Sequence, residues 1–97
     1  MPSYVILMKL TEQGAKAIKE APARIEAGIK GWEAMGGKMT GFYVVMGDYD
    51  YVAVGEAPND ETAATFVLAL GSLGNVKTTT LRAFTRDEFA ALVKKLP

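Results

Sequence analysis

The sequence predicts an α+β domain built on a four-stranded antiparallel sheet with two helices on one face. The first observation is that short apolar runs alternate along the chain with segments whose apolar residues recur every three or four positions. The second is that glycine, proline or a capping residue stands at the boundaries between these segments. The third is length: 97 residues suit one domain, so we expect residues 1–97 to form a single unit.

The chain begins with an expected strand over residues 3–10, which leads into a helix. Thr11 suits the N-cap of this helix because its hydroxyl can accept an unpaired backbone N–H. Pro22 lacks the N–H of an interior helical bond, so we expect a kink or a fresh start near Ala21. A Gly-Gly pair at 36–37 ends the helix. Its apolar face is formed by Ile18, Ala21, Ile25, Ile29 and Trp32.

Two further strands are expected over residues 38–46 and 50–56, paired as an antiparallel hairpin about the Gly-Asp turn at 47–48. Asn59 then caps a second helix that runs from Asp60 to about Leu70. Two glycines, Gly71 and Gly74, close this helix.

The last strand is expected over residues 76–84, and a capping box from Thr85 to Glu88 starts a C-terminal helix. The apolar side of that helix carries Phe89, Leu92, Val93 and Leu96. The element order therefore reads strand, helix, strand, strand, helix, strand and a further helix. This order predicts the split βαβ, or ferredoxin-like, βαββαβ arrangement with right-handed crossovers.

The expected strands are apolar on both faces, which a single layer of helices cannot cover. In residues 3–10, Tyr4, Ile6 and Met8 fall on one face, while Val5 and Leu7 fall on the other. An uncovered face would expose an apolar patch larger than a soluble monomer commonly shows. We therefore expect a second copy of the chain to cover it, as a two-fold dimer packed sheet to sheet or as a higher oligomer.

Composition excludes several classes of function. With 11 basic and 11 acidic residues the net charge is zero, which argues against nucleic acid as a partner. The chain has no cysteine and no histidine, so we expect no thiol or imidazole catalysis, no metal site and no bound cofactor. No apolar run is long enough for a membrane span, so we expect no membrane partner and a cytoplasmic location.

Four segments of the sequence match a known family pattern: Gly47-Asp48-Tyr49-Asp50, Val52-Ala53-Val54, Leu70-Gly71-Ser72-Leu73-Gly74-Asn75-Val76 and Thr78-Thr79-Thr80-Leu81-Arg82-Ala83-Phe84-Thr85. With them the sequence resembles the GYD domain family, and the likeness extends back through Ala34 to cover essentially the whole chain. Asp48 stands as the spacer between glycine and tyrosine, where the family often has other residues. The resemblance implies a small domain of the dimeric α+β-barrel group with no established reaction.

A wider likeness links the same pattern to the effector-binding domain of Lrp/AsnC-type regulators. Those domains are similar in topology and bind amino acids between assembled dimers. Because the chain begins directly with its first strand, we expect a stand-alone module without the DNA-binding half.

Asp50 is the carboxylate with the clearest choice of roles. Together with Asp48 it could act as acid and base, or it could cap backbone N–H groups beside the turn. Tyr49 and Tyr43 could line a ligand pocket with the tyrosines of neighbouring strands, or could fill a dimer barrel.

Arg82 beside Thr80, with Lys9 on a neighbouring strand, could form a clamp for an anion or a carboxylate. The alternative for Arg82 is a salt bridge, for which Glu56 is the expected partner.

Trp32 could line a pocket between helix and sheet together with Met35 and Met39, and Arg24 could contact a ligand there. The alternative for Trp32 is core packing, since it belongs to the apolar helical stripe.

These observations favour a small homo-oligomeric module that binds a small metabolite at the barrel or a subunit interface, or that serves assembly alone. The alternative function is a cofactor-free monooxygenase-like enzyme of the dimeric α+β-barrel group. In that case the acid-base work would fall on Asp50, Tyr49 or Arg82.

Overall fold

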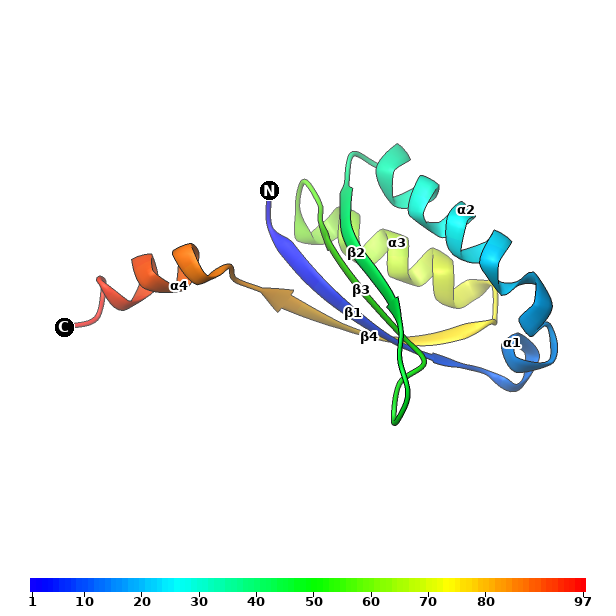
Figure 1. The fold of residues 1–97 in the computed structure, drawn as a ribbon. Helices are drawn as coiled ribbons and strands as arrows, with labels where there is room; N and C mark the ends of the chain where they lie inside the picture. The colour runs from blue at the N-terminus through cyan, green and yellow to red at the C-terminus, as the bar shows by residue number, and fades with distance from the viewer.

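The computed structural model describes residues 1–97 and shows a twisted antiparallel sheet with two helices laid across one face (Figure 1). The sheet order is β2-β3-β1-β4, and every neighbouring pair is antiparallel. This is the predicted ferredoxin-like arrangement. The strands are β1 (Ser3–Leu10), β2 (Lys38–Val44), β3 (Tyr51–Glu56) and β4 (Val76–Ala83).

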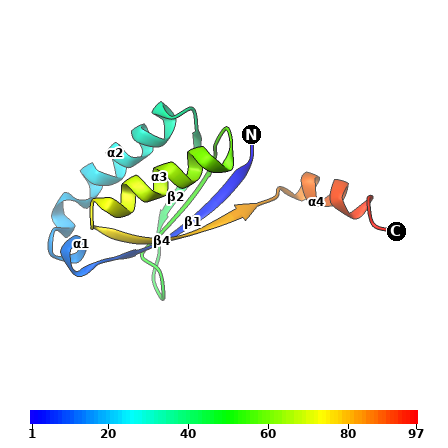
Figure 2. The same ribbon diagram turned by 180° about the vertical axis from the view of Figure 1, so that it is seen from behind.

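The helices divide into a covering pair and three shorter segments. Seen from either side, α2 and α3 lie over the same face of the sheet, whereas α4 projects beyond the end of β4 (Figures 1 and 2). None of the helices combines the length and the hydrophobicity that a membrane span requires. The helical segments are α1 (Glu12–Lys16), the 3-10 turn η1 (Ile18–Glu20), α2 (Ala21–Ala34), α3 (Asp60–Ser72) and α4 (Arg86–Val93).

The predicted break in the first helix is confirmed. Thr11 caps α1 by accepting the Gly14 N–H, and α2 starts afresh at Ala21 with Pro22 in its first turn. Proline is tolerated at this position because the N–H that it lacks would have no partner in the helix. Gly36 follows the end of α2 with a φ of 91°, the left-handed conformation that glycine adopts without strain.

Several expected boundaries are wrong by a few residues. β2 ends at Val44 rather than at residue 46, and a loop over residues 45–50 replaces the tight turn. Gly71 lies inside α3, and the chain leaves that helix at Gly74, whose φ is 82°. β4 ends at Ala83, one residue early, and α4 ends at Val93.

The hydrophobic core lies between the covering helices and one face of the sheet. Tyr4, Ile6 and Met8 alternate along β1 and point into this layer, where each is at most 5% exposed. Trp32 of α2 is the largest fully buried side chain. Its ring packs edge-on against Tyr4 and Phe66, with centroids 6.3 and 5.1 Å away.

The opposite face of the sheet is apolar as well, as the sequence predicted. The register places Val5 opposite Val54 and Leu7 opposite Val52 in the central strands. No helix of the chain lies over this face (Figures 1 and 2). Leu81 and Tyr43 continue the face on the outer strands and are 46% and 61% exposed.

Two glycines on the helical segments should respond oppositely to alanine. A Cβ at Gly14 would lie 2.2 Å from the Asn75 carbonyl oxygen, whereas a Cβ at Gly28 would meet nothing within 4 Å. We predict that Gly14→Ala destabilises the fold by about 1–3 kcal/mol. Gly28→Ala should stabilise it by about 0.5–1 kcal/mol through helix propensity. Urea unfolding measures both, and similar values for the two variants would contradict the packing of α1 against the start of β4.

Candidate functional site

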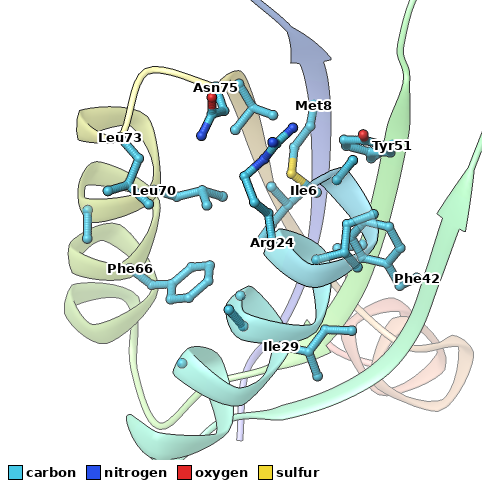
Figure 3. Close-up of a pocket in the computed structure, with 18 of the residues that line it drawn as sticks. Ile6, Met8, Arg24, Ile29, Phe42, Tyr51, Phe66, Leu70, Leu73 and Asn75 are labelled. Atoms are coloured by element: carbon cyan, nitrogen blue, oxygen red, sulfur yellow. The ribbon is translucent and has the colours of Figure 1, made fainter. Parts of the chain in front are cut away.

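A cavity of about 460 Å³ lies between α2, α3 and the sheet (Figure 3). Most of its lining is apolar and comes from elements far apart in the sequence. The sheet supplies its floor, α2 and α3 supply its walls, and Phe66 separates its lower end from Trp32. The main apolar contributors are Ile6, Met8, Ile29, Phe42, Phe66 and Leu70.

Polar side chains gather at the opposite end of the cavity. Figure 3 shows Arg24, Asn75 and Tyr51 on the side away from Phe66. Arg24 donates through Nη1 to the Ala17 carbonyl at 2.9 Å and through Nη2 to the Gly14 carbonyl at 3.4 Å. These bonds join the N-terminal part of α2 to the segment that precedes it, and they fix the guanidinium at the cavity.

A second polar cluster forms where β1 and β4 meet the start of α3. The Tyr4 hydroxyl donates a hydrogen bond to Oδ1 of Asp60. The same carboxylate lies 3.8 Å from Nε of Arg82, whose guanidinium also sits over the rings of Tyr4 and Phe84. Burial, followed by the hydrogen bond and the negative charge of Asp60, raises the pKa of Tyr4 to about 12. The neutral phenol is therefore the stable form.

Two comparisons relate the chain to known proteins. The family model described as GYD domain matches residues 4–93. The chain belongs to the GYD domain family. One relative, from Thermus thermophilus, is 37% identical over 95 residues, which is 97% of this chain and the whole length of that protein. It is named "Glutamine synthetase and cystathionine beta-lyase binding protein".

Within this GYD domain, Asp50 occupies a position that suits the capping role. Its Oδ2 accepts the Leu10 N–H at 2.8 Å, and its own N–H donates to the Met8 carbonyl. The carboxylate thus holds the end of β1 to the start of β3. The neighbouring Tyr49 has its ring 5.3 Å below the Lys9 ammonium, in the loop outside the cavity.

Asp50 and Arg82 do not share a site. Arg82 lies opposite Tyr4 near the start of β1, whereas Asp50 binds Leu10 at its end. At about 3.3 Å per residue, six residues separate them by roughly 20 Å. Arg82 is therefore not brought together with Asp50 and its neighbour Tyr49, the other candidate acid-base residues of the enzyme alternative.

Lys9, Thr80 and Arg82 do not form one clamp either. Arg82 and Thr80 pair with the buried Tyr4 and Ile6 and so share the helix-covered face, whereas Lys9 lies on the other face opposite Lys77. The acidic partner of Arg82 is Asp60 rather than Glu56, because the N-terminus of α3 brings Asp60 over the end of β4.

The predicted pocket between helix and sheet exists, but Trp32 and Met35 do not line it. Trp32 is 1% exposed and belongs to the core, and Met35 is 37% exposed after the end of α2. Met39 and Arg24 do line the cavity. Tyr43 lies apart from it, on the open face of the sheet.

Tyr51 is the one tyrosine of the expected tyrosine-lined pocket that lines the cavity, whereas sequence reasoning missed the contact of Asp60 with Tyr4. From the sequence, Asp60 is fully explained as a favourable negative charge at a helix N-terminus. That explanation gives no reason to expect its contact with a distant strand. The sequence feature that could have indicated this contact is Tyr4, because it stands among the buried, alternating residues of β1. A buried tyrosine hydroxyl usually has a hydrogen-bonding partner.

The Tyr4–Asp60 contact predicts a specific pH dependence of stability. The Tyr4 pKa is raised from 10.0 to about 12 on folding, so its contribution is complete below pH 10.0 and is lost as pH rises toward 12. Tyr4→Phe should cost about 1 kcal/mol at neutral pH through the lost hydrogen bond. It should also flatten the decline of the unfolding free energy above pH 10.0. Urea titrations across this range measure both effects, and an unchanged slope in the variant would contradict the assignment.

Proposed function

We propose that this GYD domain is a cytoplasmic, homo-oligomeric binding module that associates with metabolic enzymes and holds a small metabolite. The protein-binding part is supported by the Thermus thermophilus relative, which matches 97% of the chain and whose name records binding to glutamine synthetase and cystathionine beta-lyase. Because the match covers the whole of that protein, the shared segment includes all of its binding surfaces.

The C-terminal arm, residues 84–97, is the surface best placed to reach another protein. It extends away from the sheet and the covering helices (Figures 1 and 2). Its helix α4 begins with a complete capping box at Thr85 and Glu88, but eight residues are too few for a stable isolated helix. An apolar groove on a partner would stabilise this helix. The exposed apolar side chains of the arm are Phe84, Phe89, Leu92, Val93 and Leu96.

The open face of the sheet supports self-association. The central pairs Val5–Val54 and Leu7–Val52 present aliphatic side chains that this chain's own helices do not cover. A second copy packed on this face would bury the same surface of both chains about a two-fold axis. Because the net charge of the chain is zero, electrostatic repulsion between two copies is small.

The enzyme-binding proposal predicts a direct complex. Glutamine synthetase and cystathionine β-lyase should be purified from the organism that makes this chain, and binding to the full chain measured by isothermal titration calorimetry. We expect at least one enzyme to bind with micromolar or tighter affinity. Phe89→Asp should weaken that binding, whereas Ala91→Asp, on the opposite side of α4, should not. If neither enzyme gave a binding heat, the enzyme-binding proposal would be overturned. If the two variants bound equally well, the C-terminal arm would not be part of the binding surface.

The self-association proposal predicts a variant that separates dimer formation from folding. In a monomer, a lysine at Val54 could extend its ammonium into water, but in a dimer it would be buried against the second copy. We expect Val54→Lys to sediment as a folded monomer and the wild type as a dimer. Leu68→Lys, at a residue of α3 that is 74% exposed, is the matched control and should remain dimeric. A dimeric Val54→Lys variant would contradict the use of this face.

A further inference from the structure

We propose that the cavity between α2, α3 and the sheet binds a monocarboxylate with an apolar body, its carboxylate at Arg24 and its body extending toward Phe66. This inference deepens the small-metabolite part of the proposed function and rests on it. It does not depend on the binding of enzymes, because the cavity and the C-terminal arm are separate parts of the chain.

The size and lining of the cavity favour a ligand with an apolar body. A volume of about 460 Å³ lies within the range of small-molecule sites in proteins. Of the 21 residues that line it, 16 are hydrophobic, so a polar body would lose its hydration without recovering hydrogen bonds. An alkyl chain or an aromatic ring satisfies this lining.

The positive charge of Arg24 at the polar end of the cavity favours a ligand carboxylate there. Arg24 is a partly buried cation, with its side chain 28% exposed, and its two backbone contacts leave donors of the five-donor guanidinium unused. The nearest carboxylate, Glu20, lies 3.9 Å away on a largely exposed side chain and so neutralises Arg24 only weakly. A ligand carboxylate at this end would gain charge-assisted hydrogen bonds.

Tyr51 supplies a second polar group at this end of the cavity. Its side chain lines the cavity, and its hydroxyl takes part in none of the side-chain hydrogen bonds of the chain. Trp32 Nε1 is the one buried side-chain polar atom without a partner, so the Tyr51 hydroxyl is accessible to water and free to bond a ligand oxygen. Asn75 lies at the same end, with its Oδ1 accepting from Gln13, so its amide N–H groups remain available.

The single tryptophan reports occupancy of the cavity. Trp32 packs edge-on against Phe66 at 5.1 Å, and Phe66 lines the apolar end. The probes are decanoate and 3-phenylpropanoate, which carry the carboxylate on an alkyl and an aromatic body, and decanol, which lacks the charge. We expect a carboxylate probe to bind with a stoichiometry of one molecule per chain. Binding should give a saturable change in Trp32 fluorescence and a measurable heat in calorimetry. Decanoate should bind about tenfold or more tightly than decanol, because only its carboxylate gains charge-assisted hydrogen bonds from Arg24.

Two variants and one matched control locate the site. Gly28 lines the cavity, and a Cβ there would meet nothing within 4 Å, so Gly28→Leu should fill the space and reduce affinity about tenfold or more. Gly71→Leu is the matched control, since Gly71 has the same open surroundings in a helix but does not line the cavity. Arg24→Met keeps an apolar stem and should abolish the preference for decanoate over decanol.

Several results would overturn the proposal. These are no binding of either carboxylate to the wild type, unchanged binding by Gly28→Leu, or equal binding of decanoate and decanol by the wild type. Binding that appears only in Phe89→Asp would show instead that a second copy's α4 fills the cavity. Each of these results leaves the enzyme titrations untouched, so failure here is distinguishable from failure of the enzyme-binding proposal.

Discussion

The structure depends on a sheet that is apolar on both faces while its own helices cover only one. On the covered side, Tyr4, Ile6 and Met8 are nearly inaccessible to water, so most of the hydrophobic stabilisation lies there. On the open side, the Val5–Val54 and Leu7–Val52 pairs remain without a covering layer. This asymmetry makes contact with another protein surface energetically favourable, and it connects the fold to a binding role.

The cavity follows from how side-chain size is distributed along the two covering helices. At one end of α2, Trp32 fills the space to Tyr4 and Phe66 completely. Toward the other end the residues facing the gap include Ala27, Gly28 and Ala69, which are too small to fill it. Trp32 itself packs closely over Gly37 and Gly55, and its buried Nε1–H has no acceptor. One end of the layer is therefore tightly filled and the other is open to a ligand.

The fold was predictable because its signals are local. The capping residues Thr11 and Asn59, the restart at Pro22 and the alternation in β1 each determine a neighbouring element, and the element order then specifies the topology. The connection between β2 and β3 was less predictable, because residues 45–50 form a loop held by a hydrogen bond from Asp50 to the distant Met8 carbonyl.

The candidate site was predictable only in part. Arg24 and Met39 were placed beside a helix–sheet pocket, and both line the cavity. The Tyr4–Asp60–Arg82 cluster was not predicted, since it joins residues 56 positions apart and depends on where α3 starts relative to the sheet. Of the two roles left open for Trp32, core packing is the one found, and the pocket role fails for the same reason: a periodic pattern shows which face is buried, but side-chain volumes decide where a cavity remains.

A sheet that is apolar on both faces requires its open face to be covered in solution, and native mass spectrometry of the unmodified full chain tests this most directly. At micromolar concentration the predicted particle has twice the 10.4 kDa mass of the chain, or a higher even multiple. A single species at 10.4 kDa under the same conditions would contradict it.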